Sequence, residues 1–265
     1  MMNNHNSDDI NLNTIYQVAI ASAYHAGQVL NRYYGQLNHV EKKGAIDLVT
    51  EADLESEKAV KTIIQNHFPE HGIIAEESGI KTSQTPYEWI IDPLDGTTNY
   101  AHQIPIFAVS IAFVVNKQPV VGVVLNPVAE DLFTSIKGMG ARYNGQSIRV
   151  SQTKELSEST LVTGFPYNLR EIIDSLMLRF SKCLQSAQAV RRLGAAALDL
   201  CYVASGRFEG FWEQNLKPWD TAAGMLIAQE AGAHITNFSN VLYHYEMPEI
   251  LATNGFIHQE LLRCL

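Results

Sequence analysis

Cysteine is scarce in this sequence and long hydrophobic runs are missing, and each absence argues against a class of protein. The three cysteines, Cys183, Cys201 and Cys264, are scattered and odd in number, which predicts reduced thiols rather than a disulfide framework. No run of about 18 apolar residues occurs, so we expect no membrane span. Residues 1–9 are polar and lack the apolar segment of a secretory signal, so we expect a cytoplasmic location.

Positive charge is also scarce, with 19 lysines and arginines against 28 aspartates and glutamates and a formal net charge of −9. Nucleic-acid binding needs clustered basic side chains, so we do not expect that kind of partner. A small phosphorylated substrate remains compatible with this balance, because carboxylates that gather around bound cations reverse the local charge.

The length of 265 residues allows one large domain, 1–265, or two halves, 1–154 and 155–265, with 155–164 as the candidate junction. Apolar residues at helical spacing predict helices at 15–30, from 50–53 to the residue before Pro69, and at 171–185, 195–204 and 221–231. Short apolar runs predict strands at 73–75, 89–91, 107–115, 120–125, 132–136 and 208–213. This alternation predicts an α/β or α+β fold in which helices cover mixed sheets.

The segment 89–99 is the most informative, because it carries two acids where a predicted buried strand ends. A proline follows Asp92, and Asp95 lies three residues beyond Asp92, so one turn can direct both carboxylates into one space. Gly96 allows close backbone approach, and Thr97 can begin a helix whose N-terminus attracts phosphate. The segment therefore combines hard oxygen ligands for Mg²⁺ with a cradle for an anion, although Asp-Pro and Asp-Gly are also ordinary turn dipeptides.

Further acids lie at the ends of other predicted elements. Glu76 and Glu77 follow an apolar run, Asp53 lies at the start of the second predicted helix, and Asp220 follows Trp219 at the start of another. Carboxylates that share a poorly solvated cleft repel one another unless a cation lies between them. The pattern therefore favours a cation site.

The sequence resembles the inositol monophosphatase family, and its bacterial members especially. Two signatures carry the resemblance: WIIDPLDGTTN at 89–99, and WDTAAG at 219–224 with its continuation EAG at 230–232. Three shorter matches stand in family order: DLVT at 47–50, EESG at 76–79 and GAAALDL at 194–200. The resemblance covers roughly residues 15–232, and such a joint match of motifs is highly specific.

The resemblance implies a layered, alternating α-β-α-β-α sandwich, usually a homodimer, that hydrolyses inositol monophosphates or similar small phosphorylated alcohols. It also implies two or three Mg²⁺ ions per site, sensitivity to lithium, and in-line attack by a metal-activated water. The matching metal ligands are Glu76, Asp92, the carbonyl of Leu94, Asp95 and Asp220. The matching catalytic residues are Asp53 and Thr97, which orient the water, and Glu76. The matching substrate-binding residues are Asp95, Gly96, Thr97, Ala196, Glu213 and Asp220. Lys42 matches a lysine on a loop near the metals.

Two departures from the family pattern bear on substrate range and stability rather than on chemistry. The second glycine usual after Glu-Ala is Ala233, and the acid frequent in the next strand is Asn237. Arg191 and Arg192 are interpreted as a solvated pair or a subunit contact rather than as a phosphate site.

The substrate stays open at this point. Glu213 favours a polyol, since a carboxylate accepts hydrogen bonds from vicinal hydroxyls. The same chemistry on fructose bisphosphate, histidinol phosphate, NADP or adenosine bisphosphate is one alternative. A regulatory protein that binds a macromolecular partner, with an incidental phosphatase site, is an alternative of another class.

Overall fold

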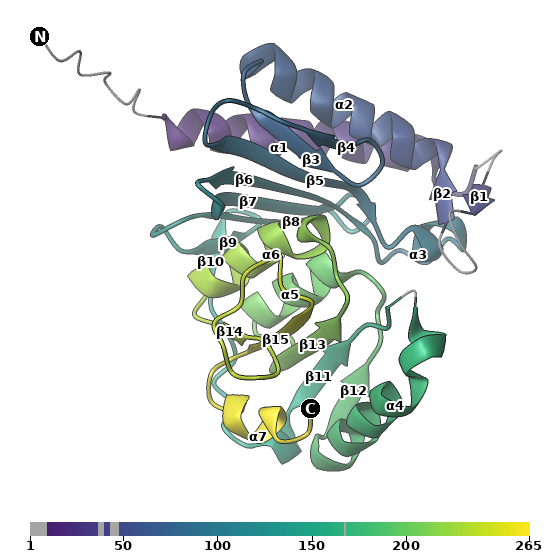
Figure 1. Cartoon of the computed structure of the whole chain (residues 1–265), viewed down its shortest axis with the longest axis vertical. Coiled ribbons are helices and arrows are strands. Elements are labelled where there is room, and N and C mark those ends of the chain that lie inside the picture. Colours follow the sequence, from purple (N-terminus) through teal and green to yellow (C-terminus); the bar gives the residue numbers. More distant parts are fainter. Residues whose placement is uncertain (1–9, 37–39, 43–47, 167) are drawn as a thin grey trace, which may run out of the picture.

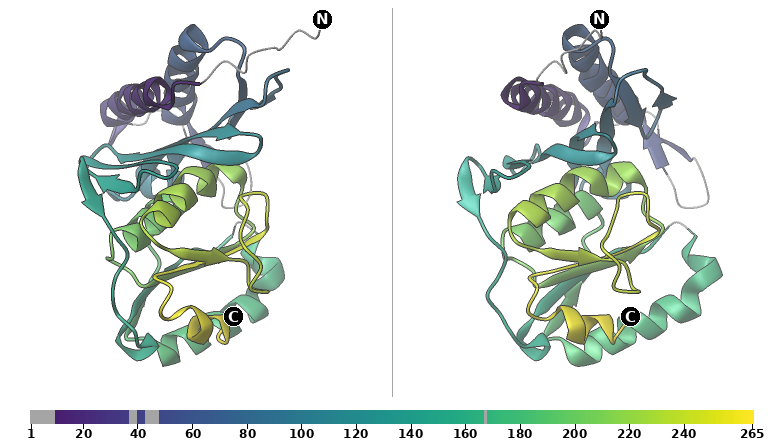
Figure 2. Two further views of the ribbon diagram at one scale, coloured as in Figure 1. Left: turned by 90° about the vertical axis from the view of Figure 1, so that its left-hand side faces the viewer. Right: turned by 60° about the vertical axis from the view of Figure 1, so that its left-hand side comes forward.

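Five layers of alternating helices and β-sheets make up the molecule, as the resemblance implied (Figure 1). The computed structural model describes residues 10–36, 40–42, 48–166 and 168–265. Two helices cover the outer face of an eight-stranded sheet, and two further helices separate that sheet from a five-stranded one. Another two helices cover the outer face of the five-stranded sheet. Turned views show the same order of layers (Figure 2). No helix of the described part is long and apolar enough to cross a membrane.

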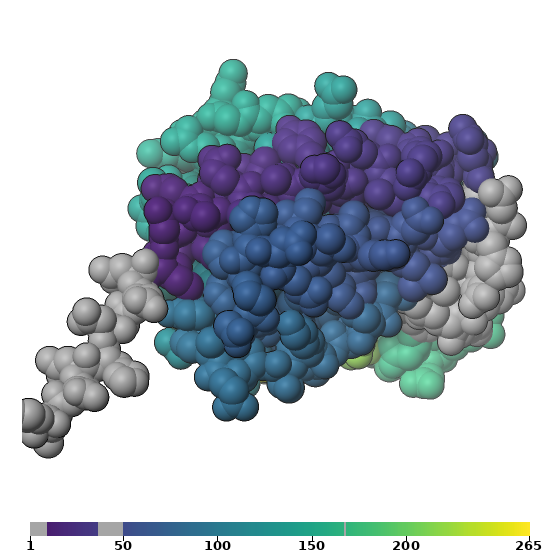
Figure 3. Space-filling model, turned by 90° about the horizontal axis from the view of Figure 1, so that it is seen from above, coloured from purple at the N-terminus to yellow at the C-terminus, as the bar shows by residue number. Residues whose placement is uncertain are grey.

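Helices α1 (Leu12–Tyr33) and α2 (Glu51–His67) lie side by side on the outer face of the larger sheet (Figure 3). α1 ends where predicted, since Gly35 takes the left-handed conformation, with φ of 75°, just beyond its last turn. α2 begins with a capping box. The side chain of Thr50 accepts a hydrogen bond from a backbone N–H in the first turn of the helix, and the side chain of Asp53 accepts one from the backbone N–H of Thr50. The apolar residues of both helices that are buried include Ile15, Ala19, Ala23, Ala26, Leu30, Val60 and Ile64.

The larger sheet has the strand order β10-β9-β8-β7-β6-β5-β3-β4. β3 and β5 pair in parallel, whereas the other neighbours pair antiparallel. Its strands are β3 (Gly72–Ala75), β4 (Gly79–Lys81), β5 (Tyr87–Asp95), β6 (Ala108–Val115), β7 (Gln118–Asn126), β8 (Asp131–Ile136), β9 (Ala141–Tyr143) and β10 (Gln146–Ile148). An antiparallel hairpin of β1 (Val40–Lys42) and β2 (Leu48–Thr50) precedes α2, and the short helix α3 (Thr97–Ala101) follows β5.

Helices α5 (Ala196–Ala204) and α6 (Pro218–Glu230) lie between the sheets, and most residues of both are buried. The smaller sheet has the order β12-β11-β13-β15-β14, with β11 parallel to β12 and β13 and with β15 antiparallel to its neighbours. α4 (Leu169–Ser186) and α7 (His258–Leu262) cover its far face (Figure 1). Its strands are β11 (Thr160–Thr163), β12 (Ala189–Arg191), β13 (Gly210–Gln214), β14 (His234–Thr236) and β15 (Glu249–Thr253), and the 3-10 turn η1 (Leu156–Glu158) precedes them.

Local boundaries differ from the sequence prediction in ways that have physical causes. The strand predicted at 208–213 is β13, two residues later, and the helix predicted from 221 begins at Pro218, a residue that is favourable in a first helical turn. The candidate junction 155–164 contains η1 and β11 rather than an unstructured linker. The chain does pass from the larger sheet to the smaller one in this region, between the end of β10 and the start of β11. The division into halves stays a prediction.

Candidate active site

A β-bulge in β5 brings two acidic side chains to the same face of the larger sheet. Asp92 pairs with Ser110 of β6 and Asp95 pairs with Ala108, so three steps along β5 match two steps along β6. On a regular strand, side chains three residues apart point to opposite faces of the sheet. The extra residue of the bulge changes this alternation, so Asp92 and Asp95 point to the same face. The sequence placed Asp92 at the end of a strand, whereas β5 continues through the bulge to Asp95.

Asp92 is almost inaccessible to solvent and lies among other acids. The residue is 1% exposed, and its carboxylate accepts a hydrogen bond from the N–H of Leu94 at 2.9 Å. Burial raises the pKa of Asp92 well above its ordinary value, and the charges of Glu76, Asp95 and Asp220 raise it further. Four carboxyl groups thus disfavour one another's ionised forms, and a bound cation would relieve this repulsion.

The first turns of α5 and α6 hold two of these acids. Asp95 accepts a hydrogen bond from the N–H of Ala197 at 2.7 Å, in the first turn of α5. Asp220 is the third residue of α6, and its carboxylate accepts from the N–H of Lys217 at 2.6 Å. Burial raises the pKa of Asp95 to about 7, while the Ala197 hydrogen bond opposes that rise. Free N–H groups at helix N-termini favour carboxylates, so both helices position an acid at the site.

Glu76 reaches the same region from β3, the parallel neighbour of β5. Its backbone N–H donates to the carbonyl of Ile91 at 3.2 Å, which extends the pairing by one residue beyond β3. Among the described residues, no three or more His, Cys, Asp or Glu side chains are grouped closely enough to hold a metal ion. The charges of Glu76, Asp95 and Asp220 nevertheless act on Asp92, so these acids share one electrostatic region.

A hydroxyl and a carboxyl group form a second part of the site. The Thr97 hydroxyl lies 3.2 Å from Oδ1 of Asp53 and 3.1 Å from the carbonyl oxygen of Leu94, and its single hydrogen can be donated to only one of them at a time. The other oxygen of Asp53 accepts from the N–H and the hydroxyl of Thr50, at 2.7 and 2.6 Å. Burial raises the pKa of Asp53 to about 6, against the lowering effect of the Thr50 hydrogen bonds.

A cavity of about 100 Å³ opens beside these groups. Its lining includes all six residues that the sequence assigned to substrate: Asp95, Gly96, Thr97, Ala196, Glu213 and Asp220. Asp92, Leu94 and Asp53 are buried rather than part of the lining. The side chain of Lys42 lies outside the described residues. The predicted residues are thus brought together by the fold, and their individual roles stay predictions.

Glu213 occupies one wall of the cavity because the facing residue has no side chain. An ideal Cβ on Gly164 would lie 2.1 Å from Oε2 of Glu213, which is too close for any larger residue. Glu213 is 7% exposed, and burial raises its pKa to about 8, with a further rise from the charge of Asp220. The buried carboxyl group is therefore harder to ionise than an exposed glutamate.

Sequence reasoning missed several residues of the site. Gly164, the last residue of the segment taken for a junction, and Phe165, which follows it, line the cavity. Arg192 also lines it, although the pair Arg191 and Arg192 was interpreted as solvated or as a subunit contact. Asp199 is completely buried, and neither of its oxygens has a hydrogen-bond partner among the described residues. The signal for Asp199 was an acid inside an otherwise apolar helix.

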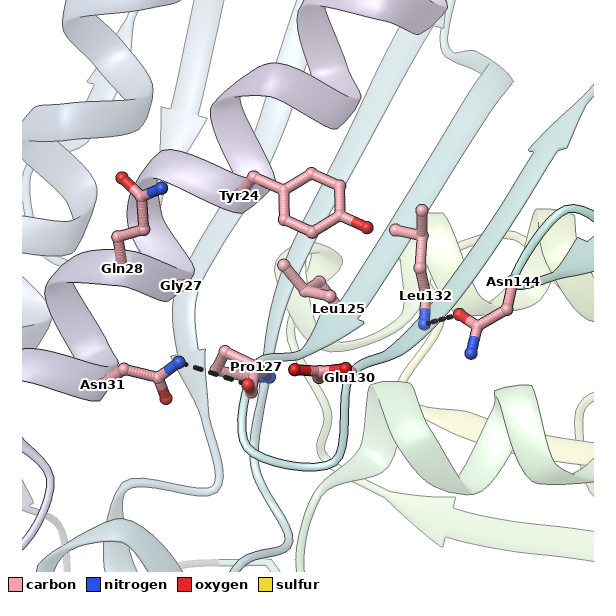
Figure 4. A pocket seen from close by; sticks show the side chains of 9 residues that line it. All are labelled: Tyr24, Gly27, Gln28, Asn31, Leu125, Pro127, Glu130, Leu132 and Asn144. Carbon is pink, nitrogen blue, oxygen red and sulfur yellow. Dashed lines mark hydrogen bonds between the residues drawn. The ribbon is translucent and has the colours of Figure 1, made fainter.

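A larger cavity, of about 580 Å³, lies elsewhere, between α1 and the loop that joins β7 to β8 (Figure 4). Tyr24, Gln28 and Asn31 approach it from one face of α1, and Glu130 is the one carboxylate in the described lining. None of the predicted site residues contributes to it. Of these two cavities, only the smaller is lined by members of the acid cluster, Asp95 and Asp220.

Known proteins resemble this chain over nearly its whole length. The model of the inositol monophosphatase family matches residues 11–265. The inositol-1-monophosphatase of Synechocystis sp. is 42% identical and aligns over 96% of this chain and 89% of its own. The Nus factor SuhB of Haemophilus influenzae is 39% identical over 95% of each chain, and the fructose-1,6-bisphosphatase/inositol-1-monophosphatase of Aquifex aeolicus 38% identical over 96% of each. The structure of an inositol monophosphatase from Anabaena (Nostoc) sp. superimposes with a TM-score of 0.88 at 45% identity, over 96% of both chains.

Proposed function

Because the chain belongs to the inositol monophosphatase family of metal-dependent phosphatases, we propose that it uses Mg²⁺ to hydrolyse inositol monophosphates or similar small phosphorylated alcohols. The observation that carries this proposal is the gathering of Glu76, Asp92, Asp95 and Asp220 around the β5 bulge. A relative described as a fructose-1,6-bisphosphatase/inositol-1-monophosphatase keeps sugar bisphosphates within the proposed range.

The kinds of donor atom at the site fit a hard divalent cation. Mg²⁺ prefers carboxylate and carbonyl oxygens, and Glu76, Asp92, Asp95, Asp220 and the carbonyl of Leu94 supply both kinds of donor. Burial and nearby acids raise the pKa values of Asp92 and Asp95, so binding a cation would stabilise their ionised forms. When bound, Mg²⁺ lowers the pKa of a coordinated water and offsets the charge of the phosphate.

The protein's own residues would orient the attacking water. When Thr97 donates its hydroxyl hydrogen to Asp53, its oxygen keeps lone pairs that can accept a hydrogen bond from a water molecule. Asp53 is held for this purpose by its two bonds from Thr50, which fix the carboxylate at the start of α2. Gly96 lines the cavity in a left-handed conformation, with φ of 93°, and neighbouring backbone atoms leave no room for a Cβ, so only glycine fits at this position.

Release of inorganic phosphate from a panel of esters, with and without divalent cations, tests the proposed function. The panel holds inositol 1-phosphate, glycerol 2-phosphate and fructose 1,6-bisphosphate. We expect exhaustive chelation to lower the rate by at least about 100-fold, and added Mg²⁺ to restore it, because the acid cluster would lose its cations. Lithium should inhibit. Full activity after chelation, or no phosphate released from any ester with Mg²⁺ present, would contradict the proposal.

Replacing Glu213 with glutamine should separate substrate recognition from chemistry. The amide keeps one acceptor oxygen but loses the charge-assisted bond to substrate hydroxyls, so kcat/KM for inositol 1-phosphate should fall by about 5- to 100-fold. Glycerol 2-phosphate, with fewer hydroxyls, should be affected much less. Because the pKa of Glu213 is about 8, the wild-type preference for inositol 1-phosphate should also rise as the pH increases from 7 to 9.

The matched control for this variant is Glu249→Gln on the neighbouring strand β15, which does not line the cavity. It should leave both rates and the melting temperature unchanged. Equal losses on the two substrates in Glu213→Gln, or a pH-independent preference in the wild type, would remove Glu213 from substrate recognition.

A second candidate function is the binding of a macromolecular partner. The Haemophilus influenzae relative is described as a Nus factor rather than by a phosphatase activity, which favours this candidate. A pull-down that retains the same partner with wild type and with Asp95→Asn would support a role separate from catalysis. Failure to retain any macromolecule at stoichiometric amounts would argue against it.

We also propose, from the family resemblance, that the protein is a cytoplasmic homodimer. Light scattering coupled to size-exclusion chromatography tests the oligomeric state, with twice the chain mass of 29.5 kDa as the expected result. Fractionation of the source cells tests the location.

A further inference from the structure

The turn between β3 and β4 carries Glu76 at the edge of the larger sheet. β4 is the edge strand, and its three residues are all exposed. The hairpin pairs at three positions, of which the pair of Ala75 and Gly79 is nearest the turn. A short hairpin at a sheet edge is marginally stable by itself, so the position of Glu76 depends on contacts from outside the hairpin.

Glu57 of α2 supplies such contacts. One carboxylate oxygen, Oε2, accepts hydrogen bonds from the backbone N–H groups of Glu77 and Ser78, at 2.9 and 3.3 Å. The other oxygen, Oε1, lies 3.4 Å from Nζ of Lys61, one turn later in α2, and the same ammonium donates to the hydroxyl of Ser78 at 2.7 Å. Glu57 is 4% exposed, so its bonds are largely shielded from competing water. Two side chains of α2 therefore clamp the residues that directly follow Glu76.

The buried face of α2 is polar at the N-terminal end of the helix and apolar beyond it. Its polar members are Asp53, Ser56 and Glu57. Asp53 accepts from the hydroxyl of Thr97, and the hydroxyl of Ser56 donates to the carbonyl of Pro93 at 2.9 Å, within the bulge of β5. An acid that served only to pack the helix on the sheet would cost more to bury than an apolar residue. The bonds to the turn explain why an acid lies at position 57.

We propose that Glu57 is a positioning residue, which acts through the backbone of the turn 76–78 to direct the carboxylate of Glu76 toward the other acids of the site. This inference rests on the proposed function, in which Glu76 is a ligand of the cation. The N–H of Glu76 is bonded to the carbonyl of Ile91 in β5, and the N–H of Glu77 is bonded to α2, so the backbone is tethered on both sides of the Glu76 side chain. Glu57 does not line the cavity, so it acts only through the turn.

Titration calorimetry with Mg²⁺ alone, on protein freed of metal by chelation, tests this role without a substrate. Glu57→Met approximately keeps the volume of the side chain but removes both acceptor oxygens, so the affinity for Mg²⁺ should fall by about 10-fold or more. Glu57→Gln keeps an acceptor oxygen for the turn and loses the charge, so its affinity should lie closer to that of the wild type. In steady-state assays, the Mg²⁺ concentration for half-maximal activity should rise in Glu57→Met, whereas kcat should recover at saturating Mg²⁺. A general loss of folded protein would lower kcat instead.

A double-mutant cycle with Glu76→Gln decides whether Glu57 acts through Glu76. In the Glu76→Gln background, Glu57→Met should weaken Mg²⁺ binding little further, because the side chain that is positioned has already lost its charge. Losses that add in the double variant would overturn the inference. Equal losses in Glu57→Met and Glu57→Gln would also overturn it, because they would assign the effect to the charge rather than to the tether.

Glu230→Met is the matched control. Glu230 is the last residue of α6, at the opposite end of that helix from Asp220, and its carboxylate oxygens accept from the N–H groups of Gly138 and Gly140 in the turn between β8 and β9. Removing this similar pair of bonds should lower the melting temperature and leave the affinity for Mg²⁺ unchanged. An equal fall in affinity in Glu230→Met and Glu57→Met would overturn the inference alone. A wild type that binds no Mg²⁺ and releases phosphate from no ester would instead overturn the proposed function.

Discussion

Asp95→Asn is expected to lower kcat by about 10³-fold or more, on every phosphomonoester that the protein hydrolyses. Asp95 lies at the bulge of β5, among the acids proposed to hold Mg²⁺, and a neutral amide is a poorer ligand for a hard cation. A loss of 10³-fold corresponds to about 4 kcal/mol of transition-state stabilisation, which is the size expected when charge held at the reacting phosphate is removed. Steady-state kinetics with saturating Mg²⁺ measures it.

The fold should survive this substitution, which separates a lost ligand from a lost structure. The amide of asparagine still offers an oxygen to the N–H of Ala197, and the acid is already difficult to ionise, since burial raises its pKa to about 7. The melting temperature of chelated protein should therefore be equal or higher. Asp174→Asn, on the exposed surface of α4, is the matched control and should retain full activity. If Asp95→Asn retained more than about a tenth of the wild-type kcat, the loss of transition-state stabilisation would be under about 1.4 kcal/mol. That result would contradict a ligand role for Asp95.

Asp53→Asn should have the second largest effect, a loss of about 10³-fold in kcat, within the range for a group that orients or accepts a proton. An amide nitrogen facing Thr97 would donate a hydrogen bond to its hydroxyl oxygen. That hydroxyl would then donate to the Leu94 carbonyl, the other acceptor within reach, and the amide would occupy one of the two lone pairs that can accept a bond from water. Substrate KM should change little, because Asp53 is buried and does not line the cavity.

Stability provides an independent check on Asp53. Burial raises its pKa from 3.8 to about 6, so the folded protein binds the proton more tightly than the unfolded chain. The associated stability is fully present below about pH 4 and is lost as the pH rises through about 6. A shift of about two units corresponds to about 3 kcal/mol, so chelated Asp53→Asn should be more stable than the wild type at pH 7, by up to that amount, and not at pH 4. Denaturant unfolding at both pH values measures the difference. A variant that is less stable at pH 7, or that keeps its activity, would show that Asp53 serves the capping box alone.

Local sequence determined the long elements and the chemical type of the site. The helical spacing of apolar residues in α1, the capping residues Thr50 and Asp53, and the buried runs of β5 and β6 depend on neighbours along the chain. The structure has all four elements, although β5 extends from Tyr87 to Asp95, well beyond the predicted run 89–91. The short strands β9, β10, β12 and β14 have three residues each, too few to show an alternating pattern, so they were not predicted. Their existence depends on pairing partners distant in sequence.

The sequence by itself determined which acids belong together, because signature motifs record a resemblance that covers most of the chain. Only the tertiary structure decided how they meet. The bulge that turns Asp92 and Asp95 to one side arises from pairing with β6, and the position of Glu213 depends on the absence of a side chain at Gly164, 49 residues earlier in the chain. Arg191 and Arg192 are chemically identical in the sequence, yet only Arg192 lines the cavity. Contacts between residues far apart in sequence fix backbone path, burial and the space left for a ligand, and no local pattern of residues carries that information.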